Sequence, residues 1–230
     1  MVEMNSELTP ETIREMFSDI EEFKMKRYEL GDERRPTIVY LLYCDGMIKS
    51  IEINEMVLPQ LNMLLTEEDY SENLDIKMDV QRLRKEELVL QIFSGQLVIY
   101  FEQQRTLFGM DLADIPQRQP EESSTEISVK GPRDAFVEEL LPNITLVRKR
   151  LRTNSLCCER FKIGTRSRTD VALLYIRDIA NPEMIDQARD RLNGIEVDLL
   201  MGSGPLEEII SDKSYSLFPL VTYTTRPDFV

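Results

Sequence analysis

The chain has 230 residues, with 42 acidic and 28 basic side chains and a formal net charge of −14. Such an acidic balance argues against general nucleic-acid binding, which needs many cations to neutralise phosphates. Histidine is absent, which removes Ser-His-Asp and Cys-His catalysis and imidazole metal sites. No spacing points to carboxylate or lysine chemistry. Glu67, Glu68 and Asp69 could bind a hard cation, but a solvated loop is the favoured interpretation, so the sequence predicts no enzyme, no metal and no cofactor.

The three cysteines are Cys44, Cys157 and Cys158. An odd count, with two residues adjacent and no CxxC motif, argues against a disulfide framework and favours a reducing compartment. The longest apolar run, residues 38–44, is far shorter than the ~18 residues that span a bilayer. The first residues lack the basic and apolar regions of a signal peptide.

The first half of the chain predicts helices on either side of a buried strand. Thr9 and Pro10 are a typical N-cap and first helical residue. The apolar, β-branched and aromatic residues 37–44 predict a buried strand. Residues 51–65 have helical spacing, and Pro59 is expected to break or kink that helix.

Further along the first half, residues 80–93 are expected to be helical, with Gly95 as a stop signal. Residues 96–101 and 105–110 then predict a β-hairpin. The polar segment 114–125, which contains two prolines and has no periodic apolar face, predicts a linker.

In the second half, the helix after Pro132 has a core face at helical spacing, and Pro142 is expected to kink or restart it. Arg148 and Arg152 are expected to project from this helix to solvent or to a partner. The remaining predicted elements are strands at 126–130, 159–163, 171–176 and 195–200, and helices at 182–192 and 205–210.

The two halves differ in charge, which supports two domains. Residues 1–116 contain 24 acidic and 12 basic residues, whereas residues 117–230 contain 18 and 16. The predicted fold class is α/β, with two small α/β subdomains containing mixed sheets. The predicted boundaries are an acidic subdomain at 1–113, a linker at 114–125 and a second subdomain at 126–230.

A basic segment runs from residue 148 to residue 168, with eight cations against one acid, Glu159. These cations could complement a helix dipole and line a solvated hairpin. Alternatively, they could form a contact surface for the acidic first half, a neighbouring subunit or anionic lipid headgroups. The residues predicted to contact a partner or membrane are Arg148, Lys149, Arg150, Arg152, Arg166 and Arg168.

Two motifs resemble signatures of the A subunits of GerA-type spore germinant receptors. The segment 129–152 resembles a "V-RGPR-x-G-F" start followed by "N-x-x-L-x-R-x-R", although Ala135 replaces a glycine. The ending SLFPLVTYTTRPD resembles "SPFPQ-x-x-x-TERPD". The main matching residues are Gly131, Pro132, Arg133, Phe136, Asn143, Arg226, Pro227 and Asp228.

This resemblance implies a soluble N-terminal region of an A subunit, followed by a membrane domain downstream of the "RPD" motif. It implies a place in the spore inner membrane, with this domain on the cytoplasmic (core) side. The implied partners are the B and C subunits, other A subunits and, through the downstream domain, the membrane. The implied role is subunit contact, assembly and coupling to a membrane channel when nutrients such as amino acids or sugars are sensed.

A different class of function stays open. The region could be a small-molecule (nutrient) or ion binding module that holds its ligand between the two lobes, because ligands favour domain interfaces.

Overall fold

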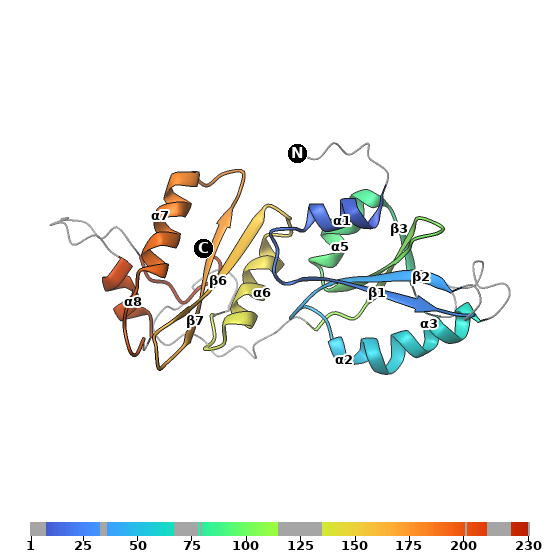
Figure 1. Cartoon of the computed structure of the whole chain (residues 1–230), viewed down its shortest axis with the longest axis horizontal. Helices are drawn as coiled ribbons and strands as arrows, with labels where there is room; N and C mark the ends of the chain where they lie inside the picture. Colours follow the sequence, from blue (N-terminus) through green and yellow to red (C-terminus); the bar gives the residue numbers. More distant parts are fainter. Residues whose placement is uncertain are drawn as a thin grey trace, which may run out of the picture. The chain divides into compact units, whose positions relative to one another are not determined.

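The computed structural model describes residues 8–32, 36–66, 78, 80–114, 135–200, 202–210 and 222–229. The described chain separates into two compact units (Figure 1). The first unit comprises residues 1–116 and 148–154, and the second comprises residues 117–147 and 155–230. Residues 148–154 thus pack with the first unit, although the predicted boundaries place them in the second subdomain. The predicted linker at 114–125 lies, apart from Asp114, outside the described residues, so its boundaries stay a prediction.

The first unit is a five-stranded sheet between two layers of helices (Figure 1). Its strand order is β1-β2-β4-β5-β3, and every pairing is antiparallel. Its elements are α1 (Pro10–Met16), β1 (Phe23–Leu30), β2 (Thr37–Cys44), α2 (Ser50–Glu52), the π-helical turn η1 (Ile53–Val57), α3 (Leu58–Leu65), β3 (Gln81–Leu83), the 3₁₀ turn η2 (Lys85–Glu87), α5 (Leu88–Ile92), β4 (Gln96–Phe101) and β5 (Thr106–Asp111).

The interior strand β2 contributes to two hydrophobic cores, because its successive side chains point to opposite faces of the sheet. Val39 and Leu41 pack with the helical segment α2–η1–α3, through residues such as Leu61. Tyr40 and Leu42 pack on the other face with α1 and α5. Burial on both faces explains why this strand has a continuous apolar sequence and not an alternating one.

Local signals account for two of the helices. Thr9 caps α1: its hydroxyl accepts a hydrogen bond from the Thr12 N–H at 3.3 Å, and Pro10 occupies the first turn. In the segment 51–65, the break expected at Pro59 takes the form of the π-turn η1, in which the Leu58 N–H donates to the Ile53 carbonyl. The wide turn lies directly before Pro59, whose missing N–H cannot continue a regular ladder.

The helix expected at 80–93 is wrong in its first half. Residues 81–83 instead form the edge strand β3 on β5, with Leu83 buried. Arg84 then ends the strand, because its N–H and its guanidinium both donate to Glu87, at 2.8 and 3.0 Å, and this pairing starts the following turn. Helical spacing alone did not reveal that the first residues complete a sheet.

The second unit is a two-stranded antiparallel hairpin with helices on its faces. The core beside α7 includes Ile163, Val171 and Leu192, whereas Ala172 and Leu174 point to the opposite face, toward α6. The described elements are α6 (Leu140–Arg150, whose last three residues belong to the first unit), β6 (Leu156–Ile163), β7 (Thr169–Ile176), α7 (Pro182–Asn193) and α8 (Ser203–Ile210).

The α/β class predicted from the sequence is confirmed, but the sheets differ from the expected mixed type because every described strand pair is antiparallel. The strand expected at 195–200 is also wrong. There the carbonyls of Val197 and Asp198 accept hydrogen bonds from the N–H groups of Thr165 and Arg166, each at 3.0 Å. The segment therefore pairs with the turn between β6 and β7 and not with a strand.

Candidate functional site

Arg148, the first cation of the basic segment, is buried in the first unit. Its side chain is 1% exposed, and its Nε and Nη2 atoms donate to one oxygen of Glu22 at 3.1 and 2.7 Å. The guanidinium also lies 5.2 Å from the ring centroid of Phe93. The expectation that Arg148 projects to solvent is therefore wrong, and of the alternatives raised from the sequence it fits a contact with the acidic first half. Because its charge is matched by an equally buried carboxylate, Arg148 is not available to another subunit or to lipid headgroups.

The cations that follow Arg148 become more exposed along the chain. Lys149 and Arg150 are partly buried, and Arg152 is exposed, with its Nε atom donating to the Lys149 carbonyl at 3.2 Å. Asn154 closes this stretch by donating to the Met16 carbonyl at 3.2 Å. Cations around the last carbonyls of α6 also complement the helix dipole.

Arg166 and Arg168 lie on the turn between β6 and β7, in the second unit. Both are exposed, and Arg166 is 3.9 Å from Asp198, the limit of an ion pair. Arg168 has a φ angle of +46°, which closes the turn in a conformation that residues with a side chain seldom adopt. The basic segment is thus divided between the two units.

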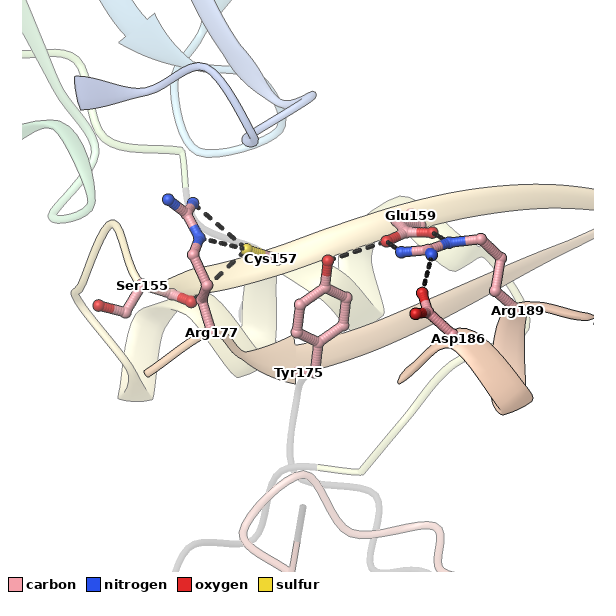
Figure 2. Close-up of polar contacts among 7 residues, drawn as sticks. All are labelled: Ser155, Cys157, Glu159, Tyr175, Arg177, Asp186 and Arg189. Carbon is pink, nitrogen blue, oxygen red and sulfur yellow. Dashed lines mark hydrogen bonds and ion pairs between the residues drawn. The ribbon is translucent and has the colours of Figure 1, made fainter. Parts of the chain in front are cut away.

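Glu159, the only acid of the basic segment, organises a polar network on β6 (Figure 2). Its carboxylate receives two hydrogen bonds from Arg189 on α7, at 2.7 and 2.8 Å, and one from the Tyr175 hydroxyl on β7, at 2.8 Å. Arg189 also pairs with Asp186 at 2.5 Å. The network links α7 to both strands of the hairpin through a bidentate arginine–carboxylate pair.

These contacts shift the acid–base behaviour of the network. The hydrogen bonds from Arg189 hold the pKa of Glu159 below its usual value, against the opposing effect of burial. Burial, helped by the hydrogen bond to Glu159, raises the pKa of Tyr175 to about 12. Both groups therefore keep their ordinary charge states over a wide pH range, as expected for a structural network.

Cys157 faces a second arginine on the same side of the hairpin (Figure 2). The Nε and Nη2 atoms of Arg177 both lie 3.4 Å from its sulfur. The cysteine is buried, and the described residues contain no group of three potential metal ligands.

The two signature segments identified in the sequence contact each other in the second unit. The Phe136 N–H donates to the Thr225 carbonyl at 2.8 Å. Asn143 both accepts from the Val137 N–H and donates to the Val137 carbonyl, each at 2.7 Å, so its amide holds the chain before α6 as a neighbouring strand would. Gly131, Pro132 and Arg133 lie outside the described residues.

The "RPD" motif forms a compact turn. Arg226 donates to the two carboxylate oxygens of Asp228 at 3.1 and 2.5 Å, and its guanidinium lies 4.5 Å from the Phe229 ring centroid. Pro227, between them, is buried. The motif is therefore a local structure in which the arginine pairs with the aspartate on either side of a buried proline.

Sequence reasoning missed Glu22 and the partners of Glu159. Glu22 is 126 positions before Arg148, and no local pattern indicates such a pairing. Glu159 did carry a signal, because a single acid among eight cations is a natural partner for an arginine. The arginine it binds, Arg189, nevertheless comes from another element.

The fold is that of a known receptor domain. The crystal structure of the N-terminal domain of the A subunit of the Bacillus megaterium spore germinant receptor GerK3 matches with a TM-score of 0.67. The match covers 97% of this chain and 87% of that one, at 22% sequence identity.

The sequence comparisons then define the family. The model of the Bacillus/Clostridium GerA spore germination protein matches residues 11–230, so the chain belongs to the GerA family. Spore germination protein XA of Bacillus anthracis is 35% identical over 97% of this chain and 47% of its own length. Stage V sporulation protein AF of Bacillus subtilis (strain 168) is 34% identical over 87% of this chain and 43% of its own length. The chain thus spans about half the length of these relatives.

Within the described residues, no helix is long and apolar enough to cross a membrane.

Proposed function

We propose that this chain is the N-terminal region of a germinant receptor A subunit and acts in nutrient-triggered spore germination through contacts with other subunits. Family membership supports the process, and the fold shared with the GerK3 domain supports the subunit type. In this proposal the region binds B and C subunits and other A subunits and couples them to a membrane channel. In the full receptor subunit, this region lies on the core side of the spore inner membrane.

The proposed contacts with other subunits are supported by one observation: the basic segment contains one buried cation and several exposed ones. Arg148 is held by Glu22, whereas Arg152, Arg166 and Arg168 are exposed. Exposed arginines contribute little to folding on their own. They remain available for carboxylates of a partner subunit or for anionic headgroups, to which a guanidinium binds well.

The experiment is charge reversal of the exposed cations in the full-length protein, in spores of the organism that encodes it. The triple variant Arg152→Glu, Arg166→Glu and Arg168→Glu should slow the nutrient-induced fall in spore optical density. Smaller amounts of the other receptor subunits should co-purify with the variant than with wild type. The matched control is Arg82→Glu, an exposed arginine on β3 outside the basic segment. Normal germination and normal co-purification of the triple variant at unchanged protein level would refute the contact role.

A further inference from the structure

The second unit contains a cavity between α6 and β7. Its volume is about 690 Å³, within the range of small-molecule sites. It lies over the face of β7 that carries Ala172 and Leu174, beside α6. The residues that line it are Phe136, Val137, Glu138, Leu140, Asn143, Ile144, Val147, Ala172, Leu174, Gly202, Tyr223, Thr224 and Thr225.

The walls of the cavity are built from the two signature segments. The hydrogen bond from the Phe136 N–H to the Thr225 carbonyl joins the segment before α6 to the segment before the "RPD" turn. The Asn143 amide fixes Val137 with two short hydrogen bonds. Three separate backbone and side-chain bonds therefore hold this wall in place, which limits the reorganisation needed for a ligand to enter.

The residues that line the cavity are mostly apolar, and the charge among them is negative. Leu140, Ile144 and Val147 of α6 face Ala172 and Leu174 of β7 and offer only hydrocarbon surface. Thr224, Thr225 and the exposed Glu138 add polar groups to the lining, and the Thr224 hydroxyl accepts a hydrogen bond from the Arg226 N–H at 3.1 Å. Among the lining residues, all of them in the described part of the chain, Glu138 alone is charged.

We propose that this cavity binds a small molecule that has an apolar body and a protonated amine. The apolar body would lie between α6 and β7, because removal of hydrocarbon from water is the main favourable term. The amine would lie beside the exposed carboxylate of Glu138. None of the described lining residues is a cation, so the carboxylate of an anionic ligand would be desolvated there without a compensating charge. The site lies within one unit, unlike a site between two lobes, and the proposal does not depend on the receptor role.

The first test is a titration of the ¹⁵N-labelled chain with three probes of matched shape: 2-phenylethylamine, 2-phenylethanol and 3-phenylpropanoate. Amide shifts should change at Ala172, Leu174 and Thr224 and not in the β1–β5 sheet. The amine should bind roughly two- to fivefold more tightly than the alcohol, the range of a partly exposed charge pair, and the anion should bind most weakly. No saturable shift at these residues with any probe, or tightest binding of the anion, would overturn the proposal.

Two variants complete the test. Glu138→Gln should remove the preference for the amine over the alcohol, whereas Glu139→Gln, an exposed neighbour that does not line the cavity, should retain it. Ala172→Phe should fill the cavity and abolish binding of both probes, with the rest of the amide spectrum as the check on folding. If Glu138→Gln retains the preference, or if a folded Ala172→Phe binds normally, the cavity is not the site.

Discussion

Arg148 and Glu22 form a buried ion pair, in which each side chain is 1% exposed and the shortest N–O distance is 2.7 Å. The arginine comes from the last turn of α6 and the carboxylate from the residue before β1. Phe93 adds a cation–π contact on the guanidinium. The pair therefore joins residues 148–154 to the sheet of the first unit, through a carboxylate 126 positions earlier in the chain.

Loss of either partner should strongly destabilise the chain. Arg148→Ala leaves the Glu22 charge buried without its guanidinium, and breaking such pairs costs about 3–5 kcal/mol. Arg152→Ala, four residues later and exposed, should change the free energy of unfolding by less than about 0.5 kcal/mol. Urea denaturation followed by circular dichroism measures both. Equal stability of Arg148→Ala and wild type would show that the pair contributes nothing.

The Glu159 network predicts a dependence of stability on pH. The pKa of Glu159 in the folded chain lies below its ordinary value of 4.5, chiefly through Arg189. A depressed pKa contributes stability that is present above pH 4.5 and is lost as the pH falls through the folded value. Denaturation midpoints of wild type should therefore fall more steeply below pH 4.5 than those of Glu159→Gln. The matched variant Glu139→Gln, at an exposed position, should follow wild type, and parallel curves for all three would contradict the prediction.

We expect the thiol of Cys44 to react with alkylating reagents only when the chain unfolds. Burial on β2 raises its pKa to about 12, and the side chain is 1% exposed. Since the thiolate is the reactive species, a brief iodoacetamide pulse at pH 8 should leave Cys44 unmodified in the folded chain and alkylate it in urea. Mass spectrometry of the digested protein measures this. Alkylation in the folded chain at the rate of an unstructured peptide would contradict the burial.

Gly95, directly before β4, has a backbone conformation that a residue with a side chain cannot adopt without strain. Its φ angle is +86°, and a Cβ atom there would lie 2.8 Å from the Met47 carbonyl oxygen. Gly95→Ala should therefore destabilise the chain by about 1–3 kcal/mol, the cost of a strained conformation. Gly204→Ala is the matched control, because a Cβ there would meet no described atom within 4 Å beyond its chain neighbours and its own helix, and alanine favours helix α8. Thermal melts should show a lower midpoint for the first variant and an unchanged or higher one for the second.

Much of the fold could be predicted because its signals are local. Residues 37–44 form β2 as their apolar content indicates, Pro182 begins α7, and the alternation of 159–163 matches the two faces of β6. The short strand β3 and β1, whose residues gave no strand prediction, depend on neighbours far away in the chain. Their pairing with β5 and β2 decides their structure, and sequence spacing does not contain that information.

In the candidate site, too, the local features could be predicted from the sequence and the long-range contacts could not. The cations of the basic segment were visible in the sequence, but which of them is buried was not. Arg148 follows the core residue Val147 and lies near the apolar face of α6, and only the distant Glu22 makes its burial possible. The cavity beside β7 was not predicted, because its walls combine residues that are about eighty positions apart.

The most direct test of the receptor role is the nutrient response of spores that lack this protein. Germination is followed by the fall in optical density after addition of amino acids, sugars and inorganic ions, in spores without the gene and in spores with the gene restored. The account predicts that the response to at least one nutrient is lost and that restoration recovers it. A restored gene with Arg148→Ala, which disturbs only this region, should recover it poorly. An unchanged response to every nutrient in the panel would contradict the role of this chain in nutrient-triggered germination.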